Sequence, residues 1–141
     1  MHKLYISLGS NLGNKEEKLR RAIELINERI GSVLRTSSFI ETEPWGFQSE
    51  NIFLNAACLV ETQLTPRQCL RETQKIERLL GRNRKSKDGV YHDRPIDIDL
   101  LLYDDLQINE GDLILPHPHM QERDFVMIPL KEIMEDSECS E

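Results

Sequence analysis

Residues 94–103 read Arg94-Pro95-Ile96-Asp97-Ile98-Asp99-Leu100-Leu101-Leu102-Tyr103. Their aliphatic run predicts a strand over 96–103. Side chains alternate along a strand, so Asp97 and Asp99 point to the same face. Two neighbouring carboxylates in an apolar strand repel each other and lose hydration, so a cation between them is favoured. The alternative is a solvated strand face whose charges protect a sheet edge.

A basic, glycine-containing loop, expected over 82–95, leads directly into this strand. Its cationic residues include Arg82, Arg84, Lys85, Lys87 and Arg94. Guanidinium groups suit phosphate, and a long loop can close over a ligand. Magnesium is bound by one or two carboxylates together with phosphate oxygens. The acid pair and the basic loop together predict a metal–nucleotide phosphoryl-transfer site, although an exposed polar loop has the same composition.

The elements on either side of this loop follow a regular order. The patterns predict a strand over 4–8, a glycine turn over 9–14, a helix ending at Gly31, strands over 33–42 and 52–62, and a helix from Pro66 to Gly81. Thr65 and Gln68 form a capping box for the second helix, and Pro66 occupies its first position. With the strand over 96–103, this order predicts an α+β fold with a ferredoxin-like βαββαβ core. We expect an antiparallel sheet with two helices packed on one face and the other face free for a ligand.

The bulk composition predicts one soluble domain over residues 1–141. Hydrophobic residues make up 38% of the chain and charged residues 30%, and the net charge is −7. Residues 132–141 carry five acidic side chains and no base. An extra short helix is expected over 126–134, followed by a frayed acidic tail over about 135–141. The charge argues against nucleic-acid binding, which needs a basic face.

The cellular setting follows from the cysteines and the apolar runs. Cys58 and Cys69 lie in apolar segments, where we expect them to pack as small hydrophobic residues. No apolar run reaches membrane-spanning length, and the chain begins directly with a strand pattern. These features predict a reduced, cytoplasmic protein that does not bind a membrane.

Aromatic residues and one amide lie where a flat ligand could use them. Trp45 stands in a polar loop beside Pro44, and Asn55 is a polar residue in an otherwise apolar strand. Aromatic rings can stack on a heterocycle while an amide reads its edges. The alternative is that these residues belong to the core. His117, between two prolines, is by default a structural histidine, and Gly9 to Gly13 is interpreted as a tight turn, since it lacks the Gly-Lys-Ser/Thr ending of a phosphate-binding loop.

Taken in order, several motifs resemble one known family. They are Ser7-Leu8-Gly9-Ser10-Asn11-Leu12-Gly13, Thr42-x-Pro44, Phe53-Leu54-Asn55-Ala56-Ala57, Gly81-Arg82-x-Arg84, Arg94-x-x-Asp97-x-Asp99-Leu100, Pro116-His117 and Arg123-x-Phe125. The series resembles 6-hydroxymethyl-7,8-dihydropterin pyrophosphokinase, from residue 4 to about residue 130. That resemblance implies a monomeric enzyme of folate biosynthesis with a ferredoxin-like core. Its reaction moves pyrophosphate from ATP to the pterin hydroxymethyl group and releases AMP.

The resemblance also implies roles for particular residues. Asp97 and Asp99 hold two Mg²⁺ ions that bridge the triphosphate, and Arg82 and Arg94 close over the phosphates as catalytic residues. The pterin site comprises Thr42, Pro44, Trp45, Phe53, Asn55 and Phe125, with the two phenylalanines on opposite sides of the ring. The ATP site comprises Gln74, Glu77, Arg82, Arg84, Tyr91, Arg94, Leu100, His117 and Arg123.

Some positions depart from the family pattern. His92-Asp93 stands before Arg94 where Gly-Pro is common, Tyr91 stands where some members have Trp, and His119 stands where many have Arg. The first difference changes backbone freedom beside a predicted catalytic arginine. The third makes one cation dependent on pH.

Two rival functions come from other classes. A ferredoxin-like sensor domain would explain the fold but not two strand carboxylates beside a basic loop. Another pterin enzyme, such as an aldolase or epimerase, would need a lysine or similar base at the pterin, and the motifs contain none.

Overall fold

The computed structural model describes residues 1–11, 13–42, 52–81 and 96–139, with side chains described as far as residue 134. The elements are β1 (His2–Ser10), α1 (Lys15–Arg29), β2 (Gly31–Thr36), β3 (Ile40–Thr42), β4 (Phe53–Thr62), α2 (Pro66–Leu79), β5 (Asp97–Tyr103), β6 (Ile108–Asn109), β7 (Ile114–Leu115), the 3₁₀ turn η1 (Met120–Glu122) and α3 (Asp124–Cys139). None of the helices in the described residues is long and apolar enough to span a membrane.

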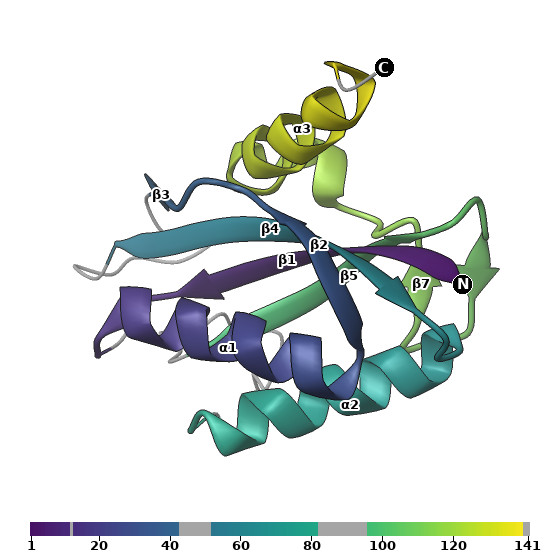
Figure 1. The fold of residues 1–141 in the computed structure, drawn as a ribbon, viewed down its shortest axis with the longest axis horizontal. Coiled ribbons are helices and arrows are strands. Elements are labelled where there is room, and N and C mark those ends of the chain that lie inside the picture. Colours follow the sequence, from purple (N-terminus) through teal and green to yellow (C-terminus); the bar gives the residue numbers. More distant parts are fainter. Residues whose placement is uncertain (12, 43–51, 82–95, 140–141) are drawn as a thin grey trace.

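The described strands form one main sheet in the order β2-β4-β1-β5. β3 pairs with the first residues of β4, and β2 pairs with its later residues. Every pairing in this sheet is antiparallel. β1 therefore lies at the centre, between the strand that carries Asn55 and the strand that carries Asp97 and Asp99. The expected ferredoxin-like order is confirmed (Figure 1).

Local signals at the helix starts operate as expected. The Thr65 hydroxyl accepts from the backbone N–H of Gln68 at 3.2 Å, and the Gln68 side chain accepts from the N–H of Thr65 at 2.9 Å. This capping box places Pro66 at the start of α2. Asn14 caps α1 by accepting from the N–H of Glu17 at 3.2 Å. These caps satisfy amide groups that a helix start leaves unpaired.

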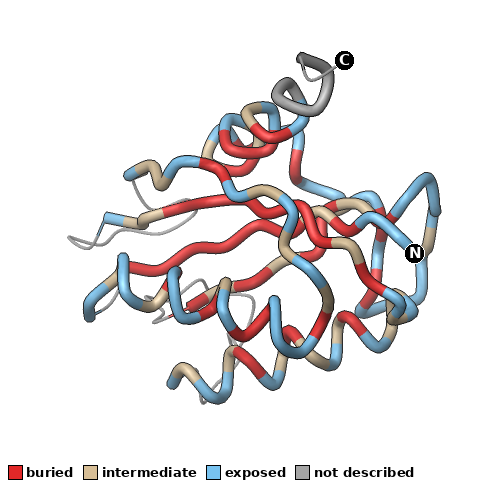
Figure 2. Tube along the Cα trace, viewed as in Figure 1, coloured by how far each residue is buried: buried red, intermediate tan, exposed pale blue. Residues whose placement is uncertain are grey.

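The main core lies between the sheet and the two helices α1 and α2. Leu4, Ile6 and Leu8 of β1 point into it, and α1 contributes Leu19, Ala22, Leu25 and Ile26. Cys58 and Cys69 are completely buried there, as expected, and burial raises the pKa of each thiol to about 11. Figure 2 shows burial concentrated in the strands and in the inward sides of the helices.

The opposite sheet face is only partly free, which corrects the sequence expectation. α3 packs on it, across the sheet from α1 and α2 (Figure 1). Its residues Val126, Leu130 and Ile133 form a second core with Ala57, Leu59, Leu101 and Met120. We call this cluster the α3-side core. α3 is also longer than the predicted helix over 126–134, and it takes in most of the tail that was expected to fray.

Two strand boundaries also differ from expectation. The predicted strand over 33–42 is divided into β2 and β3. Ser37 causes the break because it bonds to Ala57 of β4 through both its backbone N–H and its hydroxyl. Gly9 and Ser10, expected in a turn, belong to β1.

Candidate functional site

Three strands place Asn55, Gly9 and Asp97 in one row across the sheet. Gly9 of β1 is opposite Asn55 of β4 on one side and opposite Asp97 of β5 on the other. Directly opposed residues of antiparallel strands share a face, so both side chains project from the same surface. Two strand spacings separate them, which is about 10 Å. The row brings the predicted ring-reading amide near the predicted metal-binding carboxylate.

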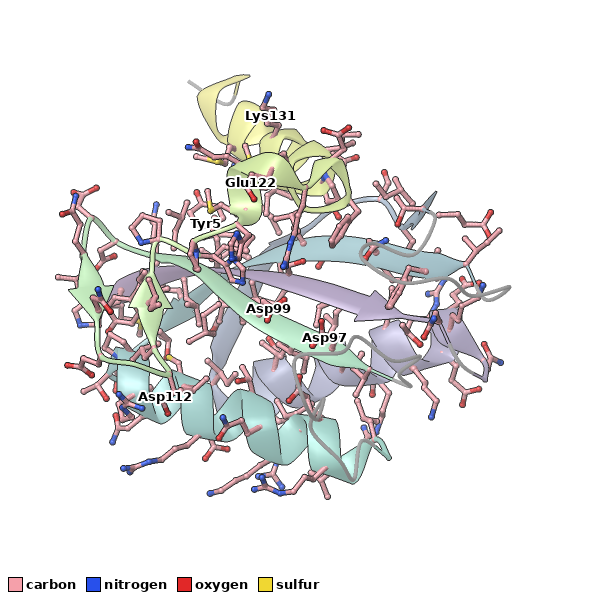
Figure 3. All side chains as sticks on the ribbon, turned by 180° about the vertical axis from the view of Figure 1, so that it is seen from behind. Tyr5, Asp97, Asp99, Asp112, Glu122 and Lys131 are labelled. Carbon is pink, nitrogen blue, oxygen red and sulfur yellow. The ribbon has the colours of Figure 1, made fainter. Side chains whose placement is uncertain are left out.

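The next row, Ala57–Ser7–Asp99, identifies which face this is. Ser7 is opposite Ala57 and also opposite Asp99. Ala57 is part of the α3-side core. Asp97 and Asp99 therefore project from the sheet face that α3 partly covers, as Figure 3 shows for the two labelled carboxylates. The predicted same-face arrangement of the acid pair is present.

Both carboxylates are half-buried, and Ile98 and Leu100, which alternate with them, are buried in the main core. Carboxylate oxygens are the donor type that Mg²⁺ prefers, and one or two suffice when phosphate oxygens complete its coordination. In the parts of the chain that the structure describes, no three metal-ligating side chains gather into one site. The donor set fits a metal ion that arrives with a polyphosphate.

Gly9 is a site residue that sequence reasoning missed. A Cβ atom at this position would lie 3.0 Å from Oδ1 of Asn55 and 3.6 Å from Cδ1 of Phe53. The Asn55 contact is tighter than normal, so any larger residue would require Asn55 to shift, whereas the Phe53 distance is an ordinary contact. The sequence placed Gly9 in a turn, and a glycine marks close approach of another group only once it is known to lie inside a strand.

Asn55 is held from the neighbouring strand. Its amide Nδ2 donates to the Thr42 hydroxyl at 2.6 Å, and its side chain is almost fully buried. β3 supplies this partner because Thr42 pairs with Phe53 and Ile40 pairs with Asn55. Three predicted pterin residues, Thr42, Phe53 and Asn55, are thus brought together at the paired ends of β3 and β4.

Glu77 of α2 reaches the backbone of β5 between the two aspartates. Its Oε2 accepts from the N–H of Ile98 at 2.8 Å. This bond holds the segment that carries Asp97 and Asp99 against α2. Gln74 lies one helical turn earlier and is half-buried. Leu100 is buried in the main core, so its side chain lies on the opposite sheet face from the acid pair.

His117 is a neutral hydrogen-bonding group beside the acid pair. Its backbone N–H donates to the carbonyl of Leu101 at 3.0 Å, and its Nδ1 accepts from the N–H of His119 at 3.2 Å. The ring proton is therefore on Nε2. Burial is the main cause that lowers the pKa of His117 to about 4; Arg123 and His119 lower it further, and Asp97 opposes them.

Arg123 and Phe125 lie where η1 ends and α3 begins. Arg123 is buried, and its guanidinium carbon lies 5.8 Å from the centre of the Phe125 ring. Arg123 and Asp97 act on the pKa of His117 in opposite directions, Arg123 lowering it and Asp97 raising it. Phe125 packs against the α3-side core. The remaining predicted residues, Pro44, Trp45, Arg82, Arg84, Tyr91 and Arg94, lie outside the described residues, as do His92 and Asp93.

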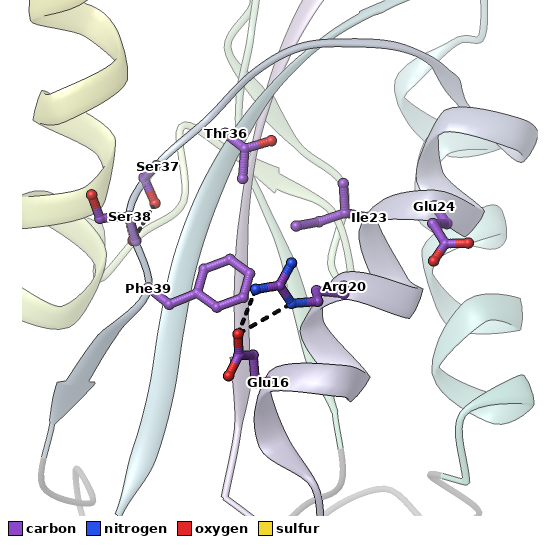
Figure 4. A pocket seen from close by; sticks show the side chains of 8 residues that line it. All are labelled: Glu16, Arg20, Ile23, Glu24, Thr36, Ser37, Ser38 and Phe39. Carbon is purple, nitrogen blue, oxygen red and sulfur yellow. Dashed lines mark hydrogen bonds and ion pairs between the residues drawn. The ribbon is translucent and has the colours of Figure 1, made fainter.

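A separate open groove of about 680 Å³ lies between α1 and the segment that joins β2 to β3 (Figure 4). It is lined by Glu16, Arg20, Ile23, Glu24, Thr36, Ser37, Ser38 and Phe39. Arg20 forms an ion pair with Glu16, and its guanidinium carbon lies 5.8 Å from the centre of the Phe39 ring. Of the predicted site residues that the structure describes, none lines this groove.

Sequence comparisons identify relatives along nearly the whole chain. A sequence profile described as 7,8-dihydro-6-hydroxymethylpterin-pyrophosphokinase (HPPK) matches residues 5–135. A Porphyromonas gingivalis protein named 2-amino-4-hydroxy-6-hydroxymethyldihydropteridine pyrophosphokinase is 50% identical over 131 residues, covering 92% of this chain and 89% of its own. A Bacillus subtilis protein of the same name is 42% identical over 135 residues, covering 95% of this chain and 79% of its own.

Solved structures show the same fold. A Plasmodium falciparum HPPK-DHPS structure, wild type with SDX-DHP, superposes with a TM-score of 0.74 at 15% identity over 90% of this chain. An HPPK-DHPS in complex with substrates gives a TM-score of 0.72 at 12% identity, also over 90% of this chain. This chain spans only 40% and 39% of those two longer chains. The likeness confirms the α+β fold, and the sequence relatives show that the chain belongs to the 7,8-dihydro-6-hydroxymethylpterin-pyrophosphokinase family.

Proposed function

We propose that the α3-side face of β4, β1 and β5 transfers pyrophosphate from ATP to 6-hydroxymethyl-7,8-dihydropterin, giving the pterin diphosphate and AMP for folate biosynthesis. The observation that carries this assignment is the row Asn55–Gly9–Asp97. It puts a group able to read the pterin about two strand spacings from a group able to bind metal and phosphate. An acceptor alcohol and a triphosphate could therefore meet above Gly9.

The β4 side of the row is the pterin site. Phe53 and Phe125 stack on the two sides of the ring, and the buried Asn55, oriented by Thr42, reads its polar edge. The backbone around Thr42, Pro44 and Trp45 completes the edge recognition. A buried amide with a fixed orientation discriminates strongly, because a ligand lacking the matching groups would leave polar atoms unpaired.

The β5 side of the row is the metal and phosphate site. Asp97 and Asp99 would hold the Mg²⁺ ions, two in our proposal, and the ions would supply positive charge against the phosphate oxygens. Glu77 orients these carboxylates through the backbone of Ile98. ATP lies against Gln74, Glu77, Arg84, Tyr91, Leu100, His117 and Arg123, with Leu100 offering its backbone because its side chain is in the main core.

The chemistry is mainly positioning and charge stabilisation. The pterin alcohol oxygen attacks the β-phosphorus in line with the departing AMP oxygen, forming one P–O bond while another breaks. Arg82 and Arg94 close over the phosphates and offset charge on the leaving group. His117 is neutral, so its Nε2–H donates a hydrogen bond without adding a charge. We propose Asp97 as the acceptor of the proton that the alcohol releases, a role that the sequence does not separate from its metal binding.

We further propose that the protein acts as a cytoplasmic monomer whose partners are these two small molecules. Its net charge of −7 disfavours nucleic acid as a partner.

Product analysis tests the proposal. Purified protein is mixed with ATP, Mg²⁺ and 6-hydroxymethyl-7,8-dihydropterin, and the nucleotides are separated. We expect AMP and pterin diphosphate in equal amounts, with none formed when the pterin or Mg²⁺ is omitted. Formation of ADP, or AMP formation that does not require the pterin, would contradict it.

A further inference from the structure

Glu132 of α3 makes a two-point contact with Ser38, in the segment that joins β2 to β3. Its Oε2 accepts from the Ser38 backbone N–H at 2.6 Å, and its Oε1 accepts from the Ser38 hydroxyl at 2.6 Å. Hydrogen bonds to an ionised acceptor are short and stronger than neutral ones, and two of them fix direction as well as distance. The partners are 94 positions apart in the chain. No motif or family position singled out either residue.

The Ser38 end of this contact is attached to the pterin side of the sheet. Ser37, just before it, bonds to Ala57 of β4 through its N–H at 2.9 Å and its hydroxyl at 2.8 Å. β3 then begins at Ile40, opposite Asn55, and ends at Thr42, the hydrogen-bond partner of Asn55. A displacement of Ser38 would therefore shift the short strand β3, and with it Thr42 and the Asn55 amide that Thr42 orients.

The Glu132 end is attached to the other side of the pterin site. Phe125 and Glu132 are seven positions apart on α3, which is close to two full turns, so they lie on nearly the same side of the helix. The apolar contacts of Val126, Leu130 and Ile133 hold α3 against the sheet. Such contacts have no preferred direction, so they define the position of α3 less sharply than hydrogen bonds do. The two hydrogen bonds from Ser38 to Glu132 are directional, so they fix the position of α3 relative to the segment that joins β2 to β3.

We propose that Glu132 is a positioning residue for pterin binding: through Ser38 it sets the gap between Phe125 on α3 and Phe53 with Asn55 on β4. This inference rests on the proposed function, since it assumes that these side chains enclose the ring. Most of the metal side is held independently, because His117 bonds to the backbone of Leu101 on β5 and Glu77 bonds to that of Ile98. Arg123 is the exception, since its carbonyl accepts from the N–H groups of Val126 and Met127 on α3. Loss of the contact should therefore impair pterin binding much more than nucleotide binding.

Titration calorimetry on the full chain tests this separation. The nucleotide probe is Mg²⁺ with an ATP analogue that has CH₂ in place of the oxygen between the α- and β-phosphorus, which cannot transfer pyrophosphate. The pterin is then titrated into the analogue-saturated protein. For Glu132→Ala we expect about tenfold weaker pterin binding, the loss typical of a charged hydrogen bond, with analogue affinity changed by less than about twofold.

Two variants separate positioning from general damage. Glu132→Gln should restore pterin affinity to within about threefold, because its amide oxygen can accept from the Ser38 N–H and its NH₂ can donate to the Ser38 hydroxyl. Lys131→Ala is the matched control: this exposed side chain is next to Glu132 and points away from the sheet (Figure 3), so it should change neither affinity.

Several results would overturn the inference. Unchanged pterin affinity in Glu132→Ala would do so, and so would equal weakening of pterin and analogue. If Glu132→Ala does not fold, Ser38→Ala removes only the hydroxyl donor and should weaken pterin binding by about threefold; no change there also rejects the inference. Failure of the proposed function looks different: the wild-type protein would not bind the pterin, or Phe53→Ala would bind it normally.

Discussion

Gly9 and Asn55 face each other across β1 and β4 so closely that a Cβ atom on Gly9 would lie 3.0 Å from Oδ1 of Asn55. The same glycine faces Asp97 on its other side. A residue without a side chain thus lies between Asn55 and Asp97, and its missing Cβ lets the Asn55 amide approach β1 closely. The proposed acceptor alcohol meets the phosphates between that amide and Asp97.

Gly9→Ala should weaken pterin binding by about tenfold or more, because the new methyl group displaces Asn55. The backbone adds no strain, since Gly9 is not left-handed, so any loss of unfolding free energy comes from the crowding of Asn55. Gly111→Ala provides the control, because it strains the backbone without crowding a neighbour. Gly111 has a φ of +74°, and an added Cβ would have no neighbouring side chain or strand within 4 Å. That variant should lose about 1 kcal/mol of stability and keep normal pterin affinity. Normal pterin binding by Gly9→Ala would remove Gly9 from the site.

Asp97→Asn and Asp99→Asn should each lower turnover by roughly a hundredfold or more while the protein stays folded, because each removes a negative ligand but keeps the side-chain shape. Steady-state rates measured over a wide range of Mg²⁺ concentration check this, with circular dichroism as the control for folding. Near-normal turnover of either variant would refute the metal assignment.

Glu77→Ala should lower the unfolding free energy by about 1–2 kcal/mol, because the N–H of Ile98 loses its acceptor. It should also raise the Mg²⁺ concentration needed for half-maximal turnover, since that N–H lies between the two aspartates. Glu77→Gln keeps an acceptor oxygen, so its unfolding free energy and its Mg²⁺ requirement should both lie close to those of the wild-type protein. A stability loss with no change in Mg²⁺ requirement would show that Glu77 supports the strand without positioning the carboxylates.

His117 makes a testable contribution to the pH dependence of stability. Its pKa is lowered from 6.5 to about 4 in the folded protein, so the unfolded chain takes up a proton at a higher pH than the folded chain. The free energy of unfolding should therefore fall as the pH drops from about 6.5 to about 4. Between these pH values the unfolding free energy of His117→Gln should fall by about 1–2 kcal/mol less than that of the wild-type protein. This figure is reduced for solvent screening of the partly exposed ring. Urea unfolding at a series of pH values measures the difference, and parallel curves for the two proteins would contradict it.

Local sequence signals predicted the parts of this fold that depend on neighbouring residues. The Thr65 capping box and the alternation of Asp97 and Asp99 with Ile98 and Leu100 act over a few positions, and both are present as expected. The strand order followed from the order of these elements. What local patterns could not show is which distant groups meet. Ser37 ends β2 only because Ala57 lies beside it, and Glu132 contacts Ser38 across 94 positions.

The covering of the second sheet face was missed for a similar reason. Val126, Leu130 and Ile133 have the spacing of an apolar helix stripe, but the sequence does not say which surface that stripe covers. The resemblance supplied Phe53, Asn55 and Phe125 as pterin residues, and the structure brings Asn55 to Thr42 and both Phe53 and Asn55 to Gly9. The roles assigned to all of these residues remain predictions. Pro44, Trp45, Arg82, Arg84, Tyr91 and Arg94 also lie outside the described part of the chain.

In the proposed site the pterin alcohol and the metal-bound phosphates meet across Gly9. Mn²⁺ in place of Mg²⁺, with the non-transferable ATP analogue, allows this to be measured, because the paramagnetic ion speeds the relaxation of protons close to it. Nuclear magnetic resonance of the bound 6-hydroxymethyl-7,8-dihydropterin should show strong relaxation of its hydroxymethyl protons, consistent with about 10 Å or less between metal and alcohol. Replacing both Asp97 and Asp99 by Asn should abolish the effect. Bound pterin whose hydroxymethyl protons relax normally, in wild-type protein carrying Mn²⁺ and the analogue, would contradict the account.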